Sequence, residues 1–170
     1  MTTRAKDLYL SEYAAIQHCT ASETEQLLQR KAAGDSAALN RLVEGNLYRV
    51  HEAASALSVK ASLFMDLVQE GSMALFLALQ EEEHYDEAFD ERIDRMIFDA
   101  MQTFLSEEEE AEKAGKELRD RLNLIDKACT MLAEKHGREA TAEEVAEVMQ
   151  MDASDVRYLM RIALSAVKKD

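Results

Sequence analysis

Four side chains within residues 66–73 recur at helical spacing and are suited to binding rather than to catalysis. Asp66, Gln69, Glu70 and Met73 fall at positions i, i+3, i+4 and i+7, which share one face of an α-helix. Carboxylates and an amide can form ion pairs and hydrogen bonds with a basic partner, and methionine adds apolar contact area. The pattern fits a docking face for another protein, although an ordinary solvated helix face can have the same composition.

The opposite side of the same segment predicts a buried packing surface. Its apolar and small residues are Leu67, Gly71, Ala74, Leu75 and Ala78. Glycine weakens a helix interior by about 1 kcal/mol relative to alanine, so Gly71 is expected where a neighbouring helix approaches closely. Met65, Ser72 and Phe76 border the polar face. Large apolar residues at this border favour the docking interpretation, because they supply affinity while the charges set the register.

No group of residues predicts catalysis or metal binding. The histidines and cysteines are scattered without metal-ligand or redox spacing, at His18, His51, His84, His136, Cys19 and Cys129. The sequence also has no Gly-rich phosphate loop and no nucleophile beside a base. We therefore expect no enzymatic activity, no metal, no cofactor and no small-molecule substrate.

The composition predicts an all-α protein. The 170 residues include no Pro, no Trp and only five Gly, so residues that interrupt helices or favour sheets are scarce. No apolar run reaches the roughly 20 residues of a membrane span, and the first residues lack the apolar segment of a signal peptide. We expect a cytoplasmic protein with reduced cysteines and no membrane partner.

Acidic residues are concentrated in the middle of the chain. The formal net charge is −14, and sixteen acids and five bases lie between Glu81 and Asp120. Nucleic-acid binders usually show the opposite, a basic surface that displaces counterions from phosphate. This segment is expected to repel DNA, and its charge suits a basic partner, a mimic of DNA charge or a solvated face.

Helical periodicity and capping signals predict two helical domains joined by an acidic connector. The first covers residues 1–105 and carries the polar stripe on a helix over 65–79. The connector covers 106–117, and pairs such as Glu109 with Lys113 predict that it is itself helical. The second domain covers 118–170, with three helices in a helix-turn-helix-like arrangement. Further helices are predicted over 7–16, 20–34, 36–57 and 90–105, with capping signals at Thr20 or Ser22, Asp35 or Ser36, Gly137, Thr141 with Glu144, and Asp152.

Several motifs resemble the bacterial sigma-70 family of RNA polymerase initiation factors. DLVQEGSMAL, residues 66–75, is similar to the family's core-binding helix D-L-I-Q-E-G-N-I-G-L. Upstream, TASETEQLLQRKAAGD is similar to T-A-E-E-E-x-x-L-x-x-x-I-x-x-G-D, and NLYRV to N-L-R-L-V. Downstream, GREATAEEVA is similar to G-R-E-P-T-x-E-E-L-A of the family's next domain. The matches occur in the family's order and extend over nearly the whole chain.

The resemblance implies an all-α, sigma-factor-like core-binding domain followed by a small helix-turn-helix-like domain. In the family, the D-L-x-Q-E-G helix packs on a coiled coil of the largest subunit of RNA polymerase. The matching polymerase-binding positions are Leu47, Val50, Met65, Asp66, Gln69, Glu70, Ser72 and Phe76. Asp66 and Glu70 are expected to pair with Arg or Lys, Gln69 to form hydrogen bonds, and Met65 and Phe76 to fill apolar gaps.

The promoter-melting segment departs from the family pattern. The corresponding stretch is FDERIDRMIFDAM, residues 89–101, and its candidate DNA-contact positions are Phe89, Arg92, Arg95 and Met96. Phe89, Ile97 and Ala100 match the family pattern and are expected to be core positions; the alternative is that Phe89 and Phe98 face DNA. The stacking tyrosine and tryptophans are replaced, and each lost base stack is worth roughly 1–3 kcal/mol. We therefore expect promoter DNA to be bound weakly or only with a second subunit. We also expect no upstream promoter-reading domain, because the sequence ends at Asp170.

Three interpretations remain open on the sequence. The first is a sigma-like protein that binds core polymerase but has degenerate melting residues. The second is a working sigma factor with unusual promoter specificity. The third is a helical scaffold or anti-sigma-type regulator whose partner is not polymerase.

Overall fold

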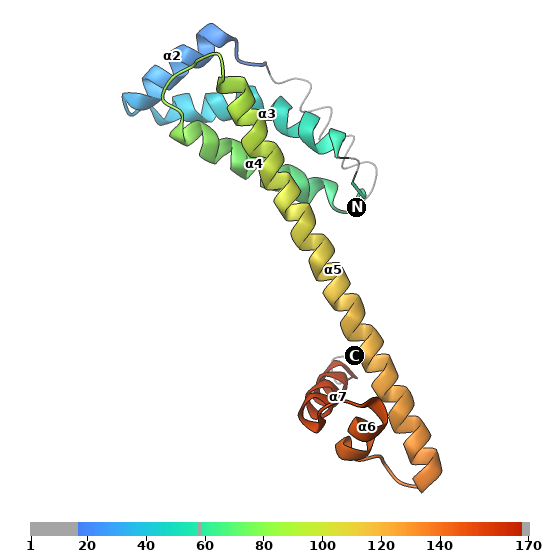
Figure 1. Ribbon diagram of the computed structural model, residues 1–170. Helices are drawn as coiled ribbons and strands as arrows, with labels where there is room; N and C mark the ends of the chain where they lie inside the picture. Colours follow the sequence, from blue (N-terminus) through green and yellow to red (C-terminus); the bar gives the residue numbers. More distant parts are fainter. Residues whose placement is uncertain (1–16, 58, 168–170) are drawn as a thin grey trace. The chain divides into compact units, whose positions relative to one another are not determined.

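Six α-helices and no strand form the part of the chain that the computed structural model describes, residues 17–57 and 59–167 (Figure 1). They are α2 (Ala21–Ala32), α3 (Ser36–Ala56), α4 (Phe64–Glu81), α5 (Phe89–His136), α6 (Ala142–Met149) and α7 (Ala153–Val167). The all-α prediction is confirmed. The helix predicted over residues 7–16 lies outside the described residues. No helix in the described ranges is both long and apolar enough to cross a membrane.

Local capping bonds explain where several helices begin. The Thr20 side chain accepts a hydrogen bond from the Glu23 amide before α2, and the Asp35 carboxylate accepts one from the Ala37 amide before α3. Before α6, Thr141 and Glu144 form a reciprocal capping box. Each bond satisfies an amide that has no partner within its helix. The predicted caps at Thr20, Asp35 and Thr141 are thus confirmed.

The first compact unit, Met1–Glu108, has a core shared by α2, α3, α4 and the opening turns of α5. Its fully buried side chains include Leu28, Leu42, Val50, Leu67, Leu75, Leu79, Ile93, Ile97 and Met101. Along each helix these residues recur every three or four positions, so one side of the helix is buried and the other remains in water. This core determines which side of α4 faces outward.

Helix α5 runs without a break over 48 residues. The sequence predicted a helical connector over 106–117 between two helices, and in the structure all three segments are one helix. No proline interrupts the segment, and its Glu, Ala and Lys residues have high helix propensity, so nothing local ends the helix there. The first turns of α5 belong to the first unit, and the turns from Glu109 onward belong to the second.

The second unit, Glu109–Asp170, packs the last turns of α5 with α6 and α7. Its core consists of Ile125, Ala128, Leu132, Val145, Ala146, Val156 and Leu159. The turn from α6 to α7 is tight, and Gln150 adopts a left-handed conformation with φ of 53°. Two short helices joined by a tight turn therefore pack on one longer helix.

Candidate functional site

The outward side of α4 presents a row of polar and apolar side chains to solvent, which we call the outer face of α4. It consists of Asp66, Gln69, Glu70, Met73, Phe76 and Leu77, all of which are exposed. Met73 is 57% exposed, Leu77 48% and Phe76 37%. Large apolar side chains are rarely so exposed in a cluster unless they contact a partner.

The polar groups of the outer face are available for binding. Within residues 17–57 and 59–167, no hydrogen bond or ion pair engages the side chains of Asp66, Gln69 or Glu70. Asp66 also lies in the first turn of α4, where the helix dipole favours a negative charge. These groups can therefore pair with a partner without first breaking a bond to their own chain.

Leu77 also belongs to this face, although it was not among the residues predicted from the sequence. Leu77 follows Met73 by four residues and Glu70 by seven, so helical spacing alone could have identified it. The side chains of Met73 and Leu77 extend the apolar part of the face beyond Phe76. Polar groups are thus grouped toward the start of α4 and apolar groups toward its end.

The inner side of α4 has no spare room at Gly71. A Cβ atom built on Gly71 would lie 2.0 Å from Cε of Met101 in α5 and 3.1 Å from Cγ1 of Val50 in α3. The prediction that Gly71 permits close approach of a neighbouring helix is therefore confirmed. Leu67, Leu75 and Ala78 are buried on the same side, which holds the outer face in a fixed orientation.

Four further residues predicted to contact polymerase lie beside or beneath the outer face. Val50 is fully buried in the core, so it is not available as a direct contact and supports α4 from below. Leu47 and Met65 are partly buried and pack against the core. Ser72 is also partly buried, and its hydroxyl donates to the Val68 carbonyl at 2.7 Å. The structure thus brings Leu47, Met65 and Ser72 near the surface, while Val50 belongs to the interior.

The residues matched to DNA-contact positions lie on the opening turns of α5, and three of the four are engaged within the protein fold. Phe89 is buried, with its ring centroid 5.0 Å from that of Tyr85, so it is a core aromatic and not a base-stacking surface. Arg92 forms ion pairs with Glu82 at 2.7 Å and Asp86 at 2.8 Å. Arg95 pairs with Glu91 one turn earlier on the exposed surface. Met96 is 40% exposed.

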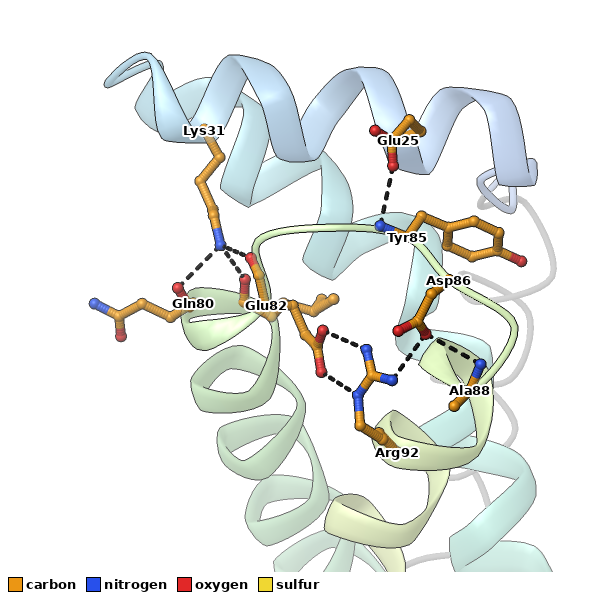
Figure 2. A network of polar contacts seen from close by, with 9 residues as sticks. Glu25, Lys31, Gln80, Glu82, Tyr85, Asp86, Ala88 and Arg92 are labelled. Atoms are coloured by element: carbon orange, nitrogen blue, oxygen red, sulfur yellow. Dashed lines mark hydrogen bonds and ion pairs between the residues drawn. The ribbon is translucent and has the colours of Figure 1, made fainter.

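The network around Arg92 fixes the loop between α4 and α5 (Figure 2). The ammonium group of Lys31, on α2, donates to the carbonyl oxygens of Leu79 at 2.8 Å and Gln80 at 2.9 Å, so it caps the end of α4. The Glu25 carboxylate accepts the Tyr85 amide at 3.0 Å. These contacts hold α2, the loop and the start of α5 together. The guanidinium group of Arg92 therefore stabilises the fold of the loop.

Several pKa values record these contacts. The hydrogen bond from Arg92 lowers the pKa of Asp86, with backbone amides adding to the effect. The Tyr85 amide is the main cause of the lowered pKa of Glu25. Burial lowers the pKa of Lys31, while Glu82 and Glu83 oppose that shift. The affected carboxylates are therefore stabilised in their charged form by the fold itself.

A third arginine, Arg49 of α3, contacts the opening turns of α5. Its guanidinium pairs with the Asp94 carboxylate at 2.8 Å and with the Asp90 carboxylate, both on α5. The Arg49 side chain is only 11% exposed. Sequence reasoning missed this contact, because nothing in the local pattern links residues that are more than forty positions apart.

Within the described ranges, no group of His, Cys, Asp and Glu side chains could hold a metal ion. Cys19 and Cys129 are both free and partly buried.

Comparisons with known proteins agree with the motifs. Residues 120–168 match the family model described as Sigma-70 region 3. The chain is 29% identical over 161 residues to RNA polymerase sigma factor SigA of a Bacillus species, and 27% identical over 161 residues to the protein of that name from Clostridium acetobutylicum. It is also 29% identical over 170 residues to that of Listeria monocytogenes. Each match covers 94% of this chain but only 43% of the relative, so the chain spans less than half the length of these proteins.

Proposed function

Because the chain belongs to the sigma-70 family of RNA polymerase sigma factors, we propose that it acts in transcription initiation by docking on core RNA polymerase through the outer face of α4. One observation carries the proposal. Asp66, Gln69 and Glu70 are exposed and have no partner in the described part of the chain, and they lie beside exposed apolar residues.

The partner that fits this face is a basic helical surface, such as the coiled coil of the largest polymerase subunit implied by the motif resemblance. Asp66 and Glu70 would pair with Arg or Lys, and Gln69 would donate and accept hydrogen bonds. Met73, Phe76 and Leu77 would be covered by apolar side chains. Truncating one partner of such a desolvated charge pair costs about 2–5 kcal/mol.

The proposal also includes weak promoter contact by this chain alone. Arg49, Arg92 and Arg95, the arginines on or facing the opening turns of α5, all pair with carboxylates of the same protein. Attraction to phosphate needs cationic charge that is not already neutralised. With Phe89 buried, the segment also lacks that ring for base stacking. Promoter melting would then be inefficient or would require a second subunit.

Co-purification with core RNA polymerase tests the docking step. Asp66→Arg and Glu70→Arg place a positive charge on the outer face, and we expect either variant to weaken binding at least thirty-fold, which corresponds to about 2 kcal/mol. Glu108→Arg is the matched control, because it changes the net charge equally at an exposed position on α5 instead of α4. Circular dichroism verifies that each variant is folded.

The outcomes separate the interpretations. Equal binding by all three variants would refute docking through α4. Failure of the wild-type chain to bind polymerase would favour a helical interaction module with another partner. A promoter-opening assay then tests the DNA part, and efficient opening by polymerase with this chain alone would contradict the proposed weak contact.

A further inference from the structure

A mainly apolar groove runs between α3 and α5 in the first unit, away from the residues that form the outer face of α4. It has a volume of about 450 Å³. Ala53 and Ala56 of α3 line one wall, and Phe98 of α5, which is 40% exposed, lines the other. The two alanines are small, so they leave space opposite the phenyl ring. Apolar area is thus left in contact with water.

The rim of this groove carries net negative charge. Glu52, Glu91 and Asp94 line it together with Arg49 and Arg95. Both arginines are already engaged, since Arg49 pairs with Asp90 and Asp94, and Arg95 pairs with Glu91. With Asp90 included, four carboxylates face two guanidinium groups. The remaining potential favours a cationic occupant and disfavours phosphate.

The length of the groove fits a short helix. Its lining extends over residues 49–56 of α3 and 91–98 of α5. Each stretch spans two helical turns, or roughly 10 Å. A helix lying in such a groove contacts it through residues at i, i+3 or i+4, and i+7. Two turns therefore accommodate an apolar anchor against Phe98, with basic side chains directed toward the rim.

We propose that the α3–α5 groove, with Phe98 and the two alanines as its apolar walls and Glu52, Glu91 and Asp94 at its rim, binds a cationic amphipathic helix of a protein partner. The apolar side of that helix covers Phe98, and its Lys or Arg side chains reach the rim carboxylates. This site is distinct from the polymerase-docking face and does not depend on it. The arginines on or facing the opening turns of α5 are paired with carboxylates of the same protein. A basic partner bound in the groove would supply positive charge that is not paired in this way.

A synthetic peptide of about 15 residues, with Leu on one face and Lys on the other, is the probe. Its binding to the full-length chain is measured by fluorescence anisotropy at physiological salt. Phe98→Glu is expected to raise Kd at least ten-fold. Met96→Glu is the matched control, because Met96 is also 40% exposed and on α5 but does not line the groove. It should change Kd less than two-fold, and a peptide with Glu in place of Lys should not bind.

The control variant also measures nonspecific attraction of a basic peptide to an acidic protein. Ala56→Trp, at an exposed position on the opposite wall, should fill the groove and weaken binding as Phe98→Glu does. Equal effects of the Phe98 and Met96 variants, or no effect of Ala56→Trp, would overturn the proposal. Tighter binding of a single-stranded DNA oligonucleotide than of the Lys peptide would overturn it as well. Polymerase co-purification with Phe98→Glu should remain unchanged, so failure here is distinguishable from failure of α4 docking.

Discussion

The outer face of α4 and the opening turns of α5 are both charged helical surfaces in the same compact unit, yet their charges are used differently. On α4, the carboxylates of Asp66 and Glu70 have no partner among the described residues. On α5, Asp90, Glu91 and Asp94 all pair with arginines. The difference supports the proposal that charge on α4 serves recognition, whereas charge on α5 serves the fold.

Composition alone would not separate these surfaces. Both helices place acids at helical spacing, and both expose large apolar residues such as Phe76 and Phe98. What differs is whether an arginine of the same protein lies within reach of the carboxylates. Variants on α5 should therefore change stability more than polymerase binding, and variants on the outer face of α4 should do the reverse.

The largest expected stability effect comes from removing Arg49. Arg49→Met keeps an apolar side chain of similar length but removes the charge-assisted hydrogen bonds to Asp90 and Asp94. Hydrogen bonds to charged groups contribute about 1.5–3 kcal/mol, so we expect a loss of that size in the free energy of unfolding. Urea denaturation monitored by circular dichroism measures it.

Arg95→Met is the control for this variant. Among the described residues Arg95 pairs only with Glu91, one turn away, and both side chains are more than 60% exposed. Such pairs contribute about 0.3–0.5 kcal/mol. Neither variant should alter polymerase binding. If Arg49→Met weakened polymerase binding and left the free energy of unfolding unchanged, the division between the two surfaces would be contradicted.

A smaller effect is expected from Gly71→Ala, which tests whether the inner side of α4 supports the outer face. The new methyl group would press on Met101 and Val50, which are both fully buried. Overpacking costs about 1–3 kcal/mol, and the better helix propensity of alanine returns up to about 1 kcal/mol. We expect a net loss of about 1–2 kcal/mol by thermal or urea denaturation.

Gly115 provides a matched comparison within a helix. A Cβ at Gly115 would meet only Nη1 of Arg119, at 3.5 Å, which is an ordinary contact. Gly115→Ala should therefore stabilise the protein by about 0.5–1 kcal/mol. If both substitutions stabilised it, the close approach at Gly71 would not constrain α4.

The smallest expected effect is a pH dependence from Asp86. Its pKa is below the ordinary value of 3.8, mainly because Arg92 donates a hydrogen bond to it. A lowered folded-state pKa gives stability that is present above 3.8 and is lost as pH falls through the folded value. Asp86→Asn should therefore make the unfolding midpoint less sensitive to acid below that pH.

Unfolding midpoints measured from neutral pH down to about pH 2.5 test this expectation. Glu87→Gln is the control, because Glu87 is an exposed neighbour whose side chain has no hydrogen bond or ion pair in the described part of the chain. If the two variants had the same acid dependence as the wild type, the Arg92 contacts would have no influence on stability.

Sequence reasoning succeeded best where the relevant interactions are local. The caps at Thr20, Asp35 and Thr141 bond to amides two or three residues away, so composition and spacing were sufficient to predict them. The two sides of α4 followed from the same periodicity, including the close contact at Gly71. The continuous α5 was foreseen only in part, because the acidic run lacks the apolar stripe by which helices are usually recognised.

The sequence by itself determined that this protein is all-α, where most of its helices begin, and which residues share the outer side of α4. These features depend on backbone hydrogen bonds and side chains within about one helical turn. Only the tertiary structure decided that Val50 is buried, that Arg49 reaches Asp90 and Asp94, and that Arg92 joins Glu82 to Asp86. The physical reason is that helix packing sets the positions of these groups, and packing brings together residues that no local pattern connects.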